Sequence, residues 1–215
     1  MRSESPQHLG HGSRWDTAGV LLSAPAPGEA LDFVAIFGNA RPVELEIGSG
    51  KGTFLLARAA ARPEVNFLGV EWAKAYAAYC ADRFRRHDLP NVRMLHADAT
   101  HLVRSSLPPA SLSRVHIYFP DPWPKRRHHR RRSIQKPFLA ELRNVLMLGG
   151  QLLIVTDHFE YACHIQRVLH EADGFLRVSF PEMADKDHEL VGTNFERKYI
   201  AQGRPFYNFA LLRYA

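Results

Sequence analysis

The chain has 215 residues, of which 46% are hydrophobic and 23% are charged, and these proportions exclude a disordered chain. Its length suits one α/β domain, and no apolar run approaches the roughly 20 residues of a membrane-spanning helix. The formal net charge of +6 favours an acidic partner such as a nucleic acid.

The N-terminal sequence MRSESPQHLGHGSRWD mixes Ser, Gly, His and charged residues and lacks the apolar core of a secretory signal. We therefore predict that residues 1–40 are a mobile tail and that residues 41–215 form the domain.

From residue 41 onward, short β-rich apolar runs alternate with helical patterns, as in repeated βα units. The predicted strands are 43–47, 66–71, 92–97, 114–119, 151–156, 175–180 and 206–214. The predicted helices are 53–61, 73–87, 136–148 and 159–172. The expected architecture is a Rossmann-like α/β fold, with a mostly parallel seven-stranded sheet and helices on both faces.

A glycine-rich turn, Glu46-Ile-Gly-Ser-Gly-Lys-Gly52, follows the first predicted strand. Glycines at such a turn let the backbone adopt positive φ and approach a ligand closely. The spacing GxGxG differs from the GxGxxG of a dinucleotide site, and the ending of a P-loop is missing. The turn predicts a cofactor loop, with a simple tight turn as the alternative.

Acidic residues lie at or just after the ends of the first three predicted strands. They are Glu46, Glu71 and Asp98, and Glu71 follows Gly50 by 21 residues, the spacing at which such folds bind a ribose. Single strand-end acids are often only exposed residues. Three together predict a ligand with a ribose, an adenine and a cationic tail, because phosphates would be bound by basic groups or bare amides.

The most unusual segment is Tyr118-Phe-Pro-Asp-Pro-Trp-Pro-Lys125, which follows the fourth predicted strand. Three prolines restrict the backbone on either side of Asp121 and Trp123. We expect Asp121 to lie beside the cofactor site, and Trp123 either to stack on a base or to pack in the protein. A rigid structural turn without a catalytic role is the alternative.

The run KRRHHRRR, from Lys125 to Arg132, holds six Lys or Arg residues and so accounts for the whole surplus of positive charge. A dense block of like charges repels itself and does not help folding. It therefore favours phosphate binding over a solvated loop or a targeting signal.

Two further motifs follow. Asp157 comes directly after the fifth predicted strand, and Thr193-Asn-Phe-Glu196 opens a short helix that ends at Gly203. A Thr followed three residues later by Glu is also the pattern of a helix capping box, so capping is the leading alternative to a binding role.

The two cysteines, Cys80 and Cys163, form no CxxC pair, and the twelve histidines show no ligand spacing. We therefore expect a reduced, cytoplasmic protein without a metal. The sequence leaves the choice between monomer and homodimer open.

Six motifs, in this order, resemble those of the bacterial tRNA (guanine-N7-)-methyltransferase family over roughly residues 41–214. They are GSGKG after Glu46, GVE ending at Glu71, Asp98-Ala99, FPDPWPK with its basic run, Thr156-Asp157, and TNFE. The resemblance implies a class I methyltransferase fold, S-adenosylmethionine as cofactor, and transfer of a methyl group to N7 of the variable-loop guanine (position 46) of tRNA.

The resemblance also implies roles for individual residues. The cofactor contacts would be Glu46, Gly48, Gly50, Glu71, Asp98, Ala99 and Asp121, with Asp121 also catalytic. The substrate contacts would be Lys125, Asp157, Thr193, Asn194, Phe195 and Glu196. The RNA contacts would be Arg127, His128, His129, Arg130, Arg131 and Arg132. Phe195 and His158 depart from the Tyr and Asn that are common in the family.

Two other functions remain open from the residues. An amino-group methyltransferase acting on adenine or a glutamine side chain also has an acidic or amide, proline and aromatic turn, but normally without an adjoining basic run. A basic RNA-binding module that has lost catalysis would not need the complete set of cofactor residues.

Overall fold

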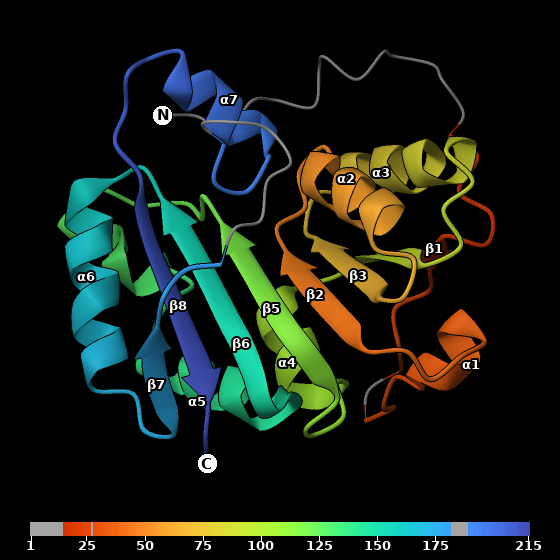
Figure 1. Cartoon of the computed structure of the whole chain (residues 1–215), viewed down its shortest axis with the longest axis horizontal. Helices are drawn as coiled ribbons and strands as arrows, with labels where there is room; N and C mark the ends of the chain where they lie inside the picture. The colour runs from red at the N-terminus through yellow and green to blue at the C-terminus, as the bar shows by residue number, and fades with distance from the viewer. Residues whose placement is uncertain (1–14, 27, 182–188) are drawn as a thin grey trace.

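The computed structural model of the chain describes residues 15–26, 28–181 and 189–215 (Figure 1). Its strands are β1 (Leu21–Leu22), β2 (Val43–Ile47), β3 (Asn66–Glu71), β4 (Val92–His96), β5 (Leu112–Tyr118), β6 (Leu146–Thr156), β7 (Phe175–Val178) and β8 (Tyr207–Arg213). Its α-helices are α1 (Phe33–Phe37), α2 (Thr53–Ala61), α3 (Lys74–Arg86), α4 (Ala99–Ser105), α5 (Lys136–Val145), α6 (Phe159–His170) and α7 (Asn194–Ile200). A 3-10 helix covers Arg126–Arg131. The predicted α/β class is confirmed.

The strands form one sheet in the order β1-β4-β3-β2-β5-β6-β8-β7. All neighbours pair in parallel except β8, which runs antiparallel to both β6 and β7. From β2 the chain first adds β3 and β4 on one side and then β5 and β6 on the other. The order therefore reverses at β2, and the carboxyl ends of β2 and β5 meet at the point where open α/β sheets bind ligands.

Alternating side chains give the sheet two apolar faces. Val43 and Leu45 of β2 pack on one face, whereas Glu44 and Glu46 point to the other. The first face is covered by α1, α4, α5 and α6, and the second by α2 and α3 (Figure 1). Helices on both faces, as expected from the sequence, bury the parallel strands and leave the loops at the carboxyl edge for function.

The N-terminal segment differs from the predicted mobile tail. Leu21 and Leu22 pair in parallel with Met94 and Leu95 of β4, which makes the sheet eight-stranded rather than seven-stranded. The short helix α1 is capped by Asp32, whose side chain accepts a hydrogen bond from the Ala35 amide. Described residues before position 41 are therefore part of the domain.

The boundary between α5 and β6 also differs from the prediction. The helix ends at Val145, and Leu146 already pairs with Leu112 of β5. Leu148, which a longer helix would have placed in its last turn, is 68% exposed within β6, next to Gly149 with its positive φ of +76° and where the register with β5 shifts. Pairing of the buried Leu146 within the sheet outweighs the helical pattern of the sequence.

Candidate active site

The loop between β2 and α2 needs its glycines. Their φ angles are +82° at Gly48, +52° at Gly50 and +67° at Gly52, in the left-handed region that other residues rarely adopt. A Cβ atom at Gly52 would also lie 2.7 Å from the ring of Phe84. The loop therefore brings bare backbone to the carboxyl edge of the sheet, directly beside the point where the strand order reverses.

Glu71, the last residue of β3, closes this loop. Its Oε2 accepts a hydrogen bond from the Gly50 amide at 2.9 Å, and its Oε1 accepts one from the Ala73 amide at 2.9 Å. Each carboxylate oxygen has a second lone pair, so these bonds leave acceptors for the two hydroxyls of a ribose. The thiol of Cys80 donates to the Gly50 carbonyl and fixes the other side of the same residue.

Glu46, the fourth residue of β2, is 3% exposed. Its Oε2 is buried without a hydrogen-bond partner, and so is the Oγ of Ser49 in the loop. Burial raises the pKa of Glu46 to about 8, against the opposing effect of the nearby Ser49 hydroxyl and with a smaller contribution from the negative charge of Glu71. A buried carboxylate oxygen without a donor is costly unless a ligand supplies one, and a cationic group would do so best.

Asp98 and Ala99 lie at the end of the next strand along the sheet. The Oδ1 of Asp98 caps α4 and accepts hydrogen bonds from the amides of Thr100 and His101, at 2.8 and 3.2 Å. Ala99 is the first residue of that helix. The exposed Asp98 carboxylate keeps lone pairs with which it can accept a bond from an exocyclic amine.

These residues fit S-adenosylmethionine, which carries an amine, a ribose and an adenine but no phosphate. Glu46 with its unpaired Oε2 suits the ammonium group, Glu71 the ribose, and Asp98 the adenine amine. The individual contacts of Glu46, Gly48, Gly50, Glu71, Asp98 and Ala99 stay predictions. Among the residues that the structure describes, no three His, Cys, Asp or Glu side chains are grouped so as to hold a metal.

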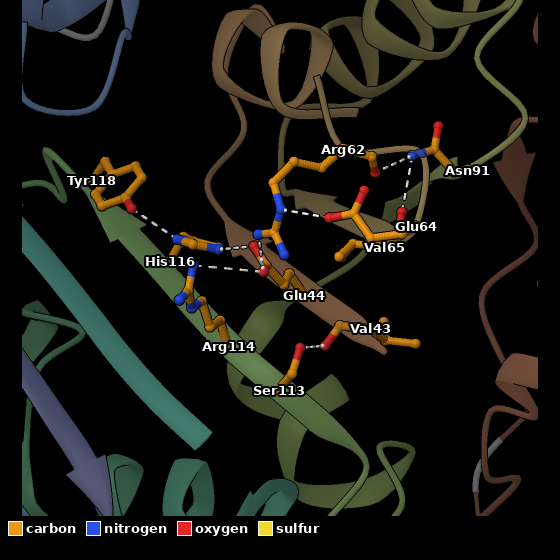
Figure 2. A network of polar contacts seen from close by, with 10 residues as sticks. All are labelled: Val43, Glu44, Arg62, Glu64, Val65, Asn91, Ser113, Arg114, His116 and Tyr118. Carbon is orange, nitrogen blue, oxygen red and sulfur yellow. Dashed lines mark hydrogen bonds and ion pairs between the residues drawn. The ribbon is translucent and has the colours of Figure 1, made fainter. Parts of the chain in front are cut away.

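A buried polar network holds the end of β5 (Figure 2). His116 lies between Glu44 of β2 and Tyr118, with Nε2 2.9 Å from Glu44 Oε2 and Nδ1 2.7 Å from the Tyr118 hydroxyl. Burial lowers the pKa of His116, so we infer a neutral ring that donates to Glu44 and accepts from Tyr118. Burial alone would raise the pKa of Glu44, but the hydrogen bond from His116 and the charge of Arg62 lower it to about 2.

This network connects the two strands that flank the site. Phe54 of α2 packs on both aromatic members, with ring centroids 4.8 Å from His116 and 5.0 Å from Tyr118. Tyr118 is the last residue of β5 and directly precedes the proline-rich turn. The start of that turn is therefore fixed to β2 and to the helix that follows the glycine loop.

The turn from Phe119 to Lys125 is strained and tightly held. Phe119 and Trp123 both have positive φ, +52° and +41°, which costs energy for residues with a Cβ. The Phe119 ring packs against Tyr199 and Phe206, with centroids 5.6 Å apart in each pair. Asp121 is exposed between two prolines, so its carboxylate is accessible on a rigid support.

The basic run forms a 3-10 helix, Arg126–Arg131, without buried residues. Arg127, Arg130 and Arg131 are exposed, and His128 and His129 are half-buried. Lys125, which caps this helix, is exposed as well. Five of the six residues expected to contact RNA thus stay candidates for that role, and Lys125 stays a candidate for substrate contact.

Arg132 departs from the prediction. Its side chain is 1% exposed, its Nε donates to the carbonyl of Pro122 at 2.8 Å, and its Nη2 pairs with Glu160 at 3.2 Å. The guanidinium also lies over the ring of Tyr161, 5.0 Å from the centroid. In this structure Arg132 therefore holds the proline-rich turn to α6 and does not present its charge to an RNA.

Asp157 lies between β6 and α6 and is half-buried. Its Oδ2 pairs with Arg204 at 2.7 Å, and Arg204 stacks on the ring of Tyr199, 4.6 Å from the centroid. Sequence reasoning missed Arg204, because nothing near it in the chain marks it as a partner of an acid 47 residues away. The pair orients Asp157 at the carboxyl edge of the sheet, where its substrate role stays a prediction.

The TNFE motif begins α7 beside the glycine loop. Thr193 caps the helix by accepting from the Glu196 amide at 3.0 Å, which is one of the two hydrogen bonds of the capping-box alternative. The Glu196 carboxylate is fully buried and accepts from the amides of Leu190, Val191 and Gly192.

Asn194 and Phe195, next to these capping residues, are exposed on the first turn of α7. The Phe195 ring lies 3.9 Å from the position of a Cβ at Gly50, so α7 packs against the cofactor loop. Direct substrate contacts by the four residues of the motif, Thr193 to Glu196, stay predictions.

Comparison with known proteins agrees with this geometry. The protein family described as "Putative methyltransferase" matches residues 40–209. A tRNA (guanine-N(7)-)-methyltransferase of Shewanella amazonensis is 39% identical over 188 residues, which cover 86% of this chain and 77% of the relative. One of Bordetella pertussis is 38% identical over 191 residues, which cover 89% and 75%.

The chain belongs to the tRNA (guanine-N(7)-)-methyltransferase family. Solved structures with a similar fold include a SAM-dependent methyltransferase from Aquifex aeolicus, with a TM-score of 0.56 and 15% identity over 84% of this chain and 87% of that one. A 30S ribosomal A1408 methyltransferase from an uncultured bacterium has a TM-score of 0.57 and 16% identity, covering 86% and 95%. The Rossmann-like methyltransferase fold and S-adenosylmethionine as its cofactor follow for this chain.

In the described part of the chain, no helix combines the length and the apolar character that crossing a bilayer requires.

Proposed function

We propose that this protein transfers a methyl group from S-adenosylmethionine to N7 of a guanine in tRNA, and that the target is the variable-loop guanine at position 46. The observation that carries the proposal is the continuity of the Phe119–Lys125 turn with the exposed 3-10 helix Arg126–Arg131. The turn follows β5, which neighbours the strand of the cofactor loop. The names of the relatives support the tRNA and guanine-N7 parts of the proposal.

The methyl transfer requires no general base from the protein. When bound, S-adenosylmethionine supplies an electrophilic methyl group on a positively charged sulfur. Guanine N7 already carries an unprotonated lone pair, so no side chain has to remove a proton from it. The protein's contribution is therefore to hold the base in line and to stabilise the positive charge that develops on its ring.

We assign the stabilisation of this positive charge to Asp121. Its carboxylate is exposed, and the flanking prolines and the Arg132–Pro122 hydrogen bond limit how far it can move. A carboxylate fixed in advance costs no reorganisation when charge appears beside it. Asp157, oriented by Arg204, has lone pairs left to accept from the N1–H and 2-amino groups that distinguish guanine from adenine.

The 3-10 helix is the part we assign to the RNA backbone. It presents four arginines and two histidines in six residues, and none of its residues is buried. Such a surface binds phosphates through counterion release, without regard to sequence. Because the target base is stacked in folded tRNA, it has to be turned out to reach the cofactor. With tRNA as substrate, we assign the reaction to the cytoplasm.

The proposal is tested by incubating purified protein with S-adenosylmethionine and tRNA that lacks the modification, followed by nucleoside analysis. We expect 7-methylguanosine as the new nucleoside. The appearance of a methylated adenosine instead would favour the amino-group methyltransferase. Absence of S-adenosylmethionine binding in a calorimetric titration would favour an RNA-binding module that has lost catalysis.

A further inference from the structure

Phe159, the first residue of α6, is an exposed aromatic side chain at the edge of the candidate site. It is 66% exposed, although most phenylalanines of this chain are buried in the two cores. Its ring packs against that of Tyr207 at the start of β8, with centroids 5.8 Å apart. A single exposed apolar ring is common on protein surfaces, so the case for a ligand depends on the position of Phe159 at the edge of the candidate site.

The position of Phe159 is fixed relative to both parts of the site. Asp157 lies two residues before it, and Glu160 directly after it pairs with Arg132 at 3.2 Å and with His129 at 3.3 Å. The start of α6 is thereby joined to the basic 3-10 helix. In Figure 1 this end of α6 lies at the same edge of the sheet as the arrowheads of β5 and β6. Phe159 is thus the neighbour in sequence of a residue that pairs with the basic run, and it lies two residues after the candidate substrate carboxylate.

Trp123 is less available for stacking than its sequence position suggests. The guanidinium of Arg131 lies over its ring, 4.9 Å from the centroid, and the His128 ring contacts it edge-on at 5.8 Å. The Arg131 guanidinium thus already occupies one face of Trp123, whereas the Phe159 residue is 66% exposed.

We propose that Phe159 is a stacking platform for an unpaired base of the tRNA, the nucleotide that flanks the methylated guanine. The inference rests on the proposed function, because turning the target out of its stack exposes the face of its neighbour. An aromatic ring beside cationic groups is the usual way in which proteins hold single-stranded RNA, since the ring stacks on the base while the cations bind the backbone. Tyr207 supports the ring from the protein side.

The test measures the dissociation constant of a tRNA transcript by fluorescence anisotropy at several salt concentrations. Phe159→Ala and Phe159→Leu are expected to weaken tRNA binding about tenfold, and Phe159→Tyr to stay within about twofold of the wild type. The dependence on salt should keep its slope, because the same phosphates remain neutralised. Tyr214→Ala is the matched control, since this ring is 56% exposed but lies beyond the other end of β8.

Two results would overturn the inference while the proposed function stands. One is wild-type affinity of Phe159→Ala for tRNA, and the other is full binding by Phe159→Leu, which keeps apolar volume without a planar ring. Calorimetric titration with S-adenosylmethionine should give the same affinity for all variants. A wild-type protein that neither binds nor methylates tRNA overturns the proposed function and this inference together, so the two failures are distinguishable.

Discussion

Arg132 and Pro122 are joined by a hydrogen bond of 2.8 Å, in which a buried guanidinium donates to a carbonyl within the proline-rich turn. The same guanidinium reaches Glu160 on α6 and stacks on Tyr161. One buried cation thus connects the turn that carries Asp121 with the helix that follows Asp157. The basic run ends at this residue. The same buried side chain therefore holds both the segment expected to bind RNA and the segment expected to be catalytic.

Arg132→Ala should therefore lower turnover more than cofactor affinity. We expect a decrease of about 1–3 kcal/mol in the free energy of unfolding from the broken hydrogen bonds. The value of kcat should fall, while the Kd for S-adenosylmethionine stays unchanged. Compared with Arg132→Ala, Arg132→Lys should restore more of the free energy of unfolding than of kcat. A lysine keeps the buried charge, but its ammonium group cannot make both hydrogen bonds in the geometry that positions the turn. Arg167→Ala, at an exposed position of α6, is the control for both measurements.

Asp121→Asn should separate catalysis from binding. Removal of the charge that stabilises the cationic guanine ring is expected to lower kcat by about 10²–10³-fold. The amide has nearly the same shape, so tRNA affinity should stay close to that of the wild type. Single-turnover kinetics and anisotropy measure the two quantities, with Asp173→Asn as an exposed control. Equal decreases in turnover and tRNA binding would remove Asp121 from its assigned role.

The buried Glu46 predicts a pH-dependent cofactor affinity. Its pKa is raised to about 8 in the ligand-free protein, so at neutral pH it must lose a proton when it binds an ammonium group. The affinity for S-adenosylmethionine should then rise up to tenfold per pH unit between about pH 6 and pH 7.5. Calorimetry in buffers of different ionisation enthalpy should detect one released proton. Glu46→Gln should bind more weakly and lose both effects.

The raised pKa of Glu46 also predicts that the ligand-free protein loses stability as pH rises, whereas its affinity for the cofactor rises. Because the pKa of Glu46 is raised from 4.5 to about 8 on folding, its stabilising contribution is complete below pH 4.5 and is lost as pH rises through about 8. Ligand-free Glu46→Gln should therefore unfold at higher denaturant concentration than the wild type at pH 8.5, with little difference near about pH 4.5. A variant that is less stable than the wild type at pH 8.5 would show that Glu46 is ionised and paired.

The 3-10 helix predicts a change in salt dependence. Arg127→Ala combined with Arg130→Ala should reduce the slope of log K against log salt by about 0.7–0.9 for each phosphate that is no longer neutralised. Binding of S-adenosylmethionine should not change, because these side chains lie outside the cofactor loop. Arg104→Ala at the end of α4 is the control. An unchanged slope in the double variant would assign RNA binding to another surface.

Local patterns were sufficient to predict much of the fold. The bounds of β2, α2 and β3 are those that apolar runs and glycines indicate in the sequence, since the two strands are buried along most of their length and α2 buries one apolar face. The two-residue strand β1 is too short to give a pattern, and its existence depends on pairing with β4. The early end of α5 likewise depends on the pairing of Leu146 with β5.

The candidate site likewise has parts that the sequence predicts and parts that it does not. The strand-end acids, the glycines and the prolines lie in short local motifs, so the sequence was sufficient to identify them. The His116–Glu44 contact joins residues 72 apart, and the Arg204–Asp157 pair joins residues 47 apart, so neither has a local signal. Burial of Arg132 within an otherwise exposed basic run could not be predicted either, because its neighbours in sequence have the same charge.

The central claim is tested most directly by methyl transfer from labelled S-adenosylmethionine to two unmodified tRNA transcripts. One transcript carries guanosine at position 46, and the other is identical except for adenosine there. We predict incorporation into the guanosine transcript alone, with 7-methylguanosine as the labelled nucleoside. Equal incorporation into both transcripts, or incorporation into neither while S-adenosylmethionine still binds, would contradict the assignment of the variable-loop guanine as the substrate.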